Sequence, residues 1–206
     1  MLRSLVGNIH SKLVFNRRTL AITNFLTPRM ISGLVLDVGC GNGIIGHTLN
    51  ERRKDIFVVG VDVLLRPKMF IPVIQYDGFI LPFDNHSFST VILIDVLHHT
   101  SEPEVILKEC ARVSRQNILV KDHFSETIVD LSLLKILDWV GNNPHGVALP
   151  YNYFSRKKWN TLWSSINLME KERYEEIPEL YPPFFQSIIG KNIQFISMLV
   201  KKGDQS

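Results

Sequence analysis

The apolar positions of the chain fall into short continuous runs and stretches with helical spacing. Leu34 to Leu36 form a short buried-strand run, and apolar residues resume at helical spacing from Ile44 to Leu49. Residues 126–140 predict a helix whose apolar side chains spread around much of its circumference, so we expect this helix to bury a broad face. Residues 156–164 predict a further helix, which Ser155 caps and whose apolar side carries Trp159, Leu162 and Trp163.

Between the first strand and its helix lie three closely spaced glycines, Gly39, Gly41 and Gly43. They permit a tight turn that leaves backbone N–H groups facing a ligand. The dinucleotide-binding turn is Gly-x-Gly-x-x-Gly, whereas Ile44 stands here at the third glycine position. Asp37 precedes the turn, where its carboxylate would repel a pyrophosphate but suit a ligand with an ammonium and a sulfonium group, such as S-adenosylmethionine.

This stretch resembles motif I of the class I S-adenosylmethionine-dependent methyltransferases, and residues 34–122 extend the resemblance. The run 58–62 is similar to the second strand and ends in Asp62, nineteen residues after Gly43, where a ribose hydroxyl needs an acceptor. Tyr76-Asp77-Gly78 resembles the adenine-holding segment. The subgroup that it resembles most is the quinone-biosynthesis type, methyltransferase type 11, through residues 91–99 (fourth strand and its exit), 103–113 (the next helix) and 117–122 (fifth strand).

The resemblance implies an α/β fold with a Rossmann-like doubly wound sheet of about seven strands, mostly parallel with an antiparallel last strand, and helices on both faces. It also implies S-adenosyl-L-methionine as the cofactor. The residues expected to bind this cofactor lie in the glycine turn and at the strand exits: Asp37, Gly39, Cys40, Gly41, Gly43, Asp62, Val63, Asp77, Gly78, Asp95 and Val96.

Two segments depart from the family pattern. The stretch between Asp62 and Asp77 is short and contains Arg66-Pro67, so we expect at most one helical turn there. Ser114 to Asn117 replace the usual Pro-Gly-Gly before the fifth strand and are expected to form a looser turn.

Length and composition favour one domain of 206 residues, because a single domain is the default below about 250 residues. The net charge of +3 is too small to favour nucleic acid as a partner, and no apolar run approaches the roughly 18 residues of a membrane span. Cys40 and Cys110 are expected to lie too far apart for a disulfide, which favours a reducing, cytoplasmic setting. The sequence leaves the oligomeric state open.

We expect four regions within this domain: an N-terminal helical cap (1–30), the cofactor-binding core (31–122), a substrate lid (123–165) and C-terminal strands (166–206). Residues 1–36 contain no acid and several arginines, which fits either an organelle transit peptide or an amphipathic cap. The cap is favoured, with Val14, Leu20, Ile22 and Phe25 among its apolar positions. Stretches 169–177 and 193–200 resemble the last two strands.

Residues 142–153 form a turn-rich segment with a histidine and two tyrosines, and are expected to cover the crevice beyond the strand ends or to be a plain surface loop. Methyl transfer needs no obligatory nucleophile and no metal ligand set is expected, but a general base helps with a hydroxyl or acidic-carbon acceptor. The candidates sit at strand exits and in the lid, and they are His98, His99, Asp122, His123 and His145, of which His99, His123 and His145 are the preferred ones. For His98 and His99, capping or packing is favoured over catalysis, whereas Asp122 could orient the His123 imidazole or cap the next helix.

A small-molecule or lipid-like acceptor is favoured over protein or nucleic acid. After the fourth strand, enzymes that methylate amide or adenine nitrogen typically carry Asn/Asp-Pro-Pro-aromatic, whereas this chain has Asp95-Val96-Leu97-His98. Tyr181 to Phe184 resemble that motif but lie just before the last strand, where they cannot face the methyl group. Neither cysteine suits cytosine methylation. Two rivals stay open: a nicotinamide-dependent oxidoreductase, which Asp37 and the missing glycine disfavour, and a protein of this fold that binds cofactor or a partner without turnover.

Overall fold

The computed structural model describes residues 16–142, 150–178, 180 and 193–203, with side chains omitted at 137, 138 and 140–142. Its centre is one seven-stranded sheet of order β3-β2-β1-β4-β5-β7-β6. The strands are β1 (Gly33–Val38), β2 (Ile56–Asp62), β3 (Val73–Gln75), β4 (Phe88–Ile94), β5 (Ser114–His123), β6 (Leu168–Tyr174) and β7 (Gln194–Lys201). The first five pair in parallel, and β7 is antiparallel to both β5 and β6. This arrangement confirms the predicted Rossmann-like fold class.

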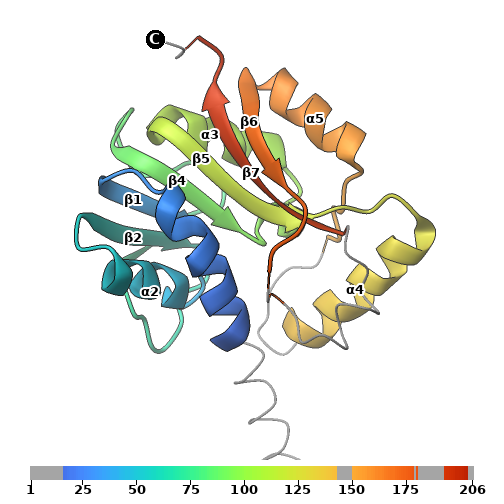
Figure 1. The fold of residues 1–206 in the computed structure, drawn as a ribbon, viewed down its shortest axis with the longest axis horizontal. Coiled ribbons are helices and arrows are strands. Elements are labelled where there is room, and N and C mark those ends of the chain that lie inside the picture. Colours follow the sequence, from blue (N-terminus) through green and yellow to red (C-terminus); the bar gives the residue numbers. More distant parts are fainter. Residues whose placement is uncertain (1–15, 143–149, 179, 181–192, 204–206) are drawn as a thin grey trace, which may run out of the picture.

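Helices lie on both faces of the sheet (Figure 1). They are α2 (Ile44–Arg52), α3 (Pro103–Val113), α4 (Ile128–Asn142) and α5 (Arg156–Ser165), with short 3-10 turns η1 (Thr27–Arg29) and η2 (Leu97–His99). A further helix spans residues 16–26. No helix among the described residues has the length and apolarity to cross a membrane.

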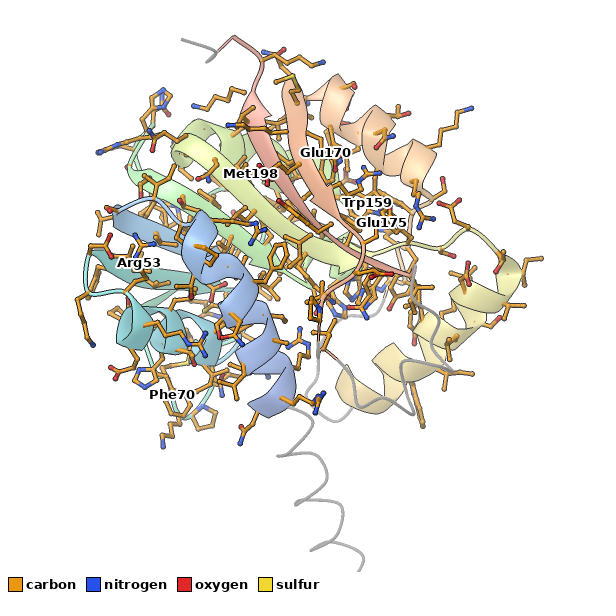
Figure 2. All side chains as sticks on the ribbon, in the orientation of Figure 1. Arg53, Phe70, Trp159, Glu170, Glu175 and Met198 are labelled. Carbon is orange, nitrogen blue, oxygen red and sulfur yellow. The ribbon has the colours of Figure 1, made fainter. Side chains whose placement is uncertain are left out.

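Alternate residues of the central strands enter two separate cores. On β4, Val91 and Leu93 pack with α3 and α5, whereas Ile92 packs with α2 and the N-terminal helix. This is the two-sided burial of a parallel sheet, and it explains why these strands read as continuous apolar runs. In Figure 2, Trp159 of α5 lies against the sheet, fully buried, with its ring 5.1 Å from that of Trp163.

The described part of the N-terminal helix packs against the sheet, and the expectation of a helical cap over residues 1–30 stays a prediction. Ile22 and Leu26 are fully buried, whereas Leu20 is 49% exposed, so its assignment to the apolar face was wrong. Val14 lies outside the described residues.

Helix α4 differs from the helix that the sequence predicts. It begins at Ile128 rather than at residue 126, and its described side chains do not bury a broad face: Ile128 is 84% exposed, Val129 75% and Ile136 61%. Only Leu134 among its described side chains is nearly fully buried. The helix stands away from the sheet in Figure 1, so apolar spacing alone did not identify its partner.

The connection before β5 also differs from the expected turn. Residues from Ser114 onward are already strand, and the pairing with β4 shifts register there, with Ser114 Oγ donating to the carbonyl of Asn117. The polar residues thus form a strand irregularity. Between β2 and β3, by contrast, the structure contains no helix, as the short linker predicted.

Candidate functional site

The three glycines turn the chain from β1 into α2 in left-handed backbone conformations, with φ of 67° at Gly39, 59° at Gly41 and 78° at Gly43. A Cβ at Gly39 would lie 2.6 Å from Val96 Cγ2, so this glycine is needed for packing. A Cβ at Gly41 would meet no atom within 4 Å. The backbone at Gly41 therefore faces open space, which a ligand could occupy.

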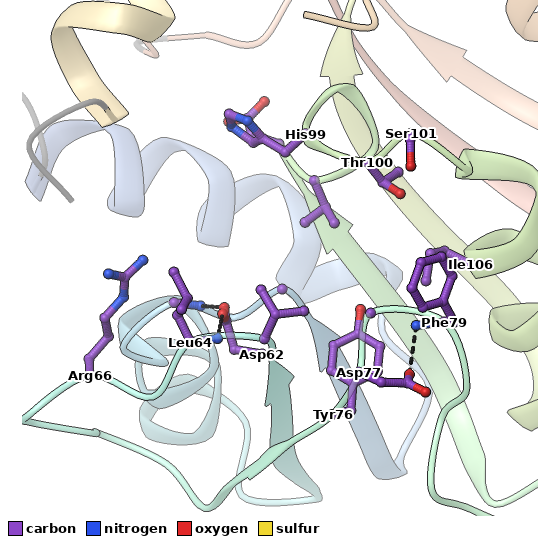
Figure 3. Close-up of a pocket in the computed structure, with 16 residues that line it drawn as sticks. Asp62, Leu64, Arg66, Tyr76, Asp77, Phe79, His99, Thr100, Ser101 and Ile106 are labelled. Carbon is purple, nitrogen blue, oxygen red and sulfur yellow. Dashed lines mark hydrogen bonds between the residues drawn. The ribbon is translucent and has the colours of Figure 1, made fainter. Parts of the chain in front are cut away.

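Asp62 ties the end of β2 to this turn. Its Oδ2 accepts a 2.7 Å hydrogen bond from the Gly41 N–H, and its Oδ1 accepts one of 2.9 Å from the Leu64 N–H (Figure 3). The carboxylate is thus fixed in orientation at the parallel strands' carboxyl ends, where ligands of such sheets bind.

Asp77 follows β3 and is held in a comparable way. Its Oδ1 accepts hydrogen bonds from the N–H groups of Phe79 (2.8 Å) and Ile80 (2.9 Å), which keep the pKa of the carboxyl below its usual value. Neighbouring Tyr76 is largely buried, and burial raises its pKa. The phenol therefore stays neutral.

These groups surround a cavity of about 460 Å³. Figure 3 shows the η2 side, including His99, facing Asp62 across the cavity. The lining contains Gly39, Gly41, Asp62, Val63, Leu64, Arg66, Tyr76, Asp77, Gly78, Phe79, Asp95, Val96, His99, Thr100, Ser101 and Ile106.

Most of the predicted cofactor residues line this cavity, together with His99 among the predicted bases. Asp37, Cys40 and Gly43 do not line it: Gly43 is instead the N-cap residue of α2, and the Cys40 side chain packs against Gly60 of β2. His145 lies outside the described residues. Both cysteines are free, as expected, and burial raises the pKa of each thiol.

Asp37 lies at the end of β1 and is 2% exposed. Its Oδ2 is buried and forms no hydrogen bond with the described part of the chain. Burial, and secondly the charge of Asp62, raise its pKa to about 8. A buried carboxyl oxygen without a partner beside the glycine turn is compatible with a cationic ligand.

Asp95 follows β4 with a left-handed φ of 56°, rare for a non-glycine residue. Its Oδ1 accepts a 2.5 Å hydrogen bond from Lys121 Nζ on β5, and its Oδ2 pairs with Arg18 of the N-terminal helix. These cations outweigh the effect of burial and hold the pKa of Asp95 well below its usual range. Three segments distant in sequence thus meet at one cavity-lining carboxylate.

Beside this ion pair lies a cluster of rings. His98 Nδ1 lies 2.7 Å from Oδ1 of the fully buried Asp122, whose Oδ2 accepts from the Leu97 N–H. The His98 ring lies 4.0 Å from that of His99 and stacks on Tyr153 at 5.0 Å. Asp122 thus has His98 as its hydrogen-bonded imidazole partner and His123 as a second imidazole nearby, and the expectation that it orients His123 stays a prediction.

His123 lies at the exit of β5. Its Nδ1 is buried without a hydrogen bond, 3.5 Å from Asp95 Oδ1 and 3.6 Å from Asp122 Oδ1. Burial, followed by the nearby Lys121 charge, lowers its pKa to about 4, so the imidazole is neutral at pH 7. The two carboxylates favour the tautomer with the proton on Nδ1, which leaves Nε2 as an acceptor.

The ligand atoms of Asp95, His98, Asp122 and His123 lie within 4.8 Å of one another, a set that a metal ion could use. However, Lys121 and Arg18 already occupy both oxygens of Asp95, and His98 binds Asp122. A metal ion would have to displace these cations, so the expectation of no metal stays a prediction.

Sequence reasoning missed Lys121 and Arg18. The signal for Lys121 was available, since it is a lysine in a run that is otherwise buried, and a buried lysine requires a partner. No such signal marked Arg18 as a site residue, because its partner Asp95 lies 77 residues away in the sequence.

Comparison with known proteins agrees with this geometry. Residues 36–119 match a family model described as a methyltransferase domain. Over 99 residues the chain is 28% identical to a ubiquinone biosynthesis O-methyltransferase of Neisseria meningitidis, a match that covers 42% of this chain and 41% of the relative. The match therefore spans less than half the length of that relative.

Solved structures extend the likeness over most of the chain. The methyltransferase seen in complex with the Haloferax volcanii Trm112 methyltransferase activator has a TM-score of 0.68 and 14% identity, with 89% of this chain and 90% of that chain covered. Geranyl diphosphate C-methyltransferase from Streptomyces coelicolor gives 0.67 and 12%, covering 88% and 78%. Residues 36–119 therefore resemble a methyltransferase domain, and the chain shares its fold with these solved methyltransferases.

Proposed function

We propose that this protein transfers a methyl group from S-adenosylmethionine to a small-molecule or lipid-like acceptor. The observation that carries the proposal is the cavity over the glycine turn, lined by Asp62 and Asp77 from successive strand ends. The cofactor residues fit the cationic adenosyl compound: Asp62 and Asp77 offer fixed acceptors for ribose and adenine donors, and Gly41 leaves room beside its backbone.

The bound cofactor supplies a methyl group already activated by positive sulfur, so the protein's task is alignment. We assign the acceptor to the cavity side bounded by His99 and Asp95. Beside this part of the cavity, the neutral imidazole of His123 can accept a proton at Nε2, while Asp95 and Asp122 stabilise the proton on Nδ1. His99 is a second candidate for this role, because it lines the cavity, and His145 is a third.

A small acceptor is favoured by the known activities of the relatives, which include ubiquinone biosynthesis O-methylation and geranyl diphosphate C-methylation. The low formal charge gives no support for a nucleic-acid partner. The part of the chain that the structure describes contains no membrane-spanning helix.

The first test is calorimetric titration of the full chain with S-adenosylmethionine, S-adenosylhomocysteine and NAD(P). We expect binding of the two adenosyl compounds and none of the nicotinamides. Binding of NAD(P) alone would favour the oxidoreductase. Incubation with labelled cofactor and a broad metabolite extract then tests turnover, since tight cofactor binding without any labelled product would favour the binding-only alternative.

A further inference from the structure

The surroundings of Asp37 are unfavourable for a negative charge. Its carboxyl is 2% exposed, and Oδ2 has no hydrogen-bond donor among the described residues. No arginine, lysine or histidine of the described chain forms an ion pair with it. The strand registers place Gly60 and Ile92 at its sides, and neither carries a compensating charge.

The titratable groups that face Asp37 add to this difficulty. Asp62 of β2 is a second carboxyl nearby and makes ionisation of Asp37 harder. Cys40 of the glycine turn is neutral, because burial raises the pKa of its thiol. An isolated buried carboxylate is costly, and such a group responds by keeping its proton.

A ligand that brings positive charge to the glycine turn reverses this balance. S-adenosylmethionine carries a sulfonium and an ammonium group, either of which would stabilise the ionised carboxyl. We propose that Asp37 is protonated in the cofactor-free protein and gives this proton to solvent when the cationic cofactor binds, so that binding and proton release are linked at one residue. This inference rests on the proposed function.

The linkage has a definite sign. Below neutral pH, binding must expel the proton, so the dissociation constant should fall by up to about tenfold for each unit of rising pH. The dependence should level off above about pH 8, where Asp37 is already ionised without cofactor. The Asp37→Asn variant keeps the shape and loses the titration, so it is the matched control for titration of the ligand's own amino group and of other residues.

The test is calorimetry of the full chain at about pH 6.5 in two buffers of different ionisation enthalpy, because the difference in measured heat gives the number of protons released. We expect the wild type to release close to one proton and Asp37→Asn close to none. Equal release with S-adenosylmethionine and S-adenosylhomocysteine would support neutralisation by their shared ammonium, and greater release with the former would support the sulfonium.

Two results would overturn the inference while leaving the proposed function intact: cofactor binding with the same heat in both buffers, or a variant that releases as many protons as the wild type. Failure of both adenosyl compounds to bind would instead overturn the proposed function, and this inference with it. Should Asp37→Asn not fold, infrared difference spectroscopy of the wild type decides, since a protonated-carboxyl band should disappear on binding and its persistence would contradict the proposal.

Discussion

Lys121 Nζ lies 2.5 Å from Asp95 Oδ1, which joins the exits of β5 and β4 directly beside the cavity. The lysine is 1% exposed, and burial lowers its pKa while Asp95 raises it. Such a pair contributes little net stability relative to apolar residues, but it is costly to break from one side. Its position suggests a role in placing the cavity-lining carboxylate.

The first prediction concerns this pair. Lys121→Met should lower the free energy of unfolding by about 3 kcal/mol, because Asp95 loses one of its two cations and Arg18 remains. Urea denaturation at neutral pH measures the loss. The double variant Lys121→Met/Asp95→Asn should recover part of it, since no uncompensated charge is left. A single variant as stable as the wild type would contradict the interpretation.

The strands of the central sheet could be located because they are buried on both faces and form continuous apolar runs. The run from Val91 to Ile94 is one example: all four residues are at most 8% exposed. Helix α4 could not be predicted as well, because helical spacing shows which residues share a face but not whether anything covers that face. Ile128 and Ile136 share the pattern of a core helix and are nevertheless exposed.

For the candidate site, too, some features could be predicted from the sequence and others could not. Asp62 and Asp77 could be located because parallel topology brings the carboxyl ends of neighbouring strands to one edge. Contacts between distant side chains depend on packing that no local pattern records. The pairing of Arg18 with Asp95, and of His98 rather than His123 with Asp122, belongs to this second kind.

The second prediction separates two glycines of the turn. Gly41→Ala should lower the free energy of unfolding by only about 1–2 kcal/mol, because its φ is left-handed but the new Cβ meets no atom. The same Cβ should weaken cofactor binding, because it would occupy the cavity. Gly39→Ala should destabilise the fold further, because its Cβ would clash with Val96. Thermal unfolding and calorimetry on both variants check this, and equal losses of stability would count against it.

The third prediction concerns Asp62. Asp62→Asn should weaken cofactor binding by about ten- to a hundredfold, because the amide cannot accept from both Gly41 and Leu64 and still serve a hydroxyl donor. Calorimetric titration measures the affinity. Asp84→Asn, on an exposed loop, is the matched control and should bind as the wild type does. Unchanged affinity in Asp62→Asn would remove this residue from the site.

The fourth prediction tests His123 as the proton acceptor. Once an acceptor is known, His123→Gln should lower kcat by about a hundredfold or more while leaving the affinity for S-adenosylhomocysteine unchanged, because the residue lies outside the cofactor cavity. Steady-state kinetics and calorimetry separate the two effects. His47→Gln on α2 provides the control. If turnover survives in His123→Gln, His99 becomes the leading candidate.

The fifth prediction follows from the lowered pKa of His123. The unfolded chain takes up a proton on this imidazole near pH 6.5, whereas the folded protein resists protonation until about pH 4. The contribution of this group to stability is therefore fully present above pH 6.5 and is lost as the pH falls towards 4, by up to about 3 kcal/mol. Urea unfolding at a series of pH values should show this decline in the wild type and a shallower one in His123→Gln. Parallel curves for the two proteins would mean that the imidazole titrates in the folded protein as it does in the unfolded chain, contrary to the buried position that the structure gives it.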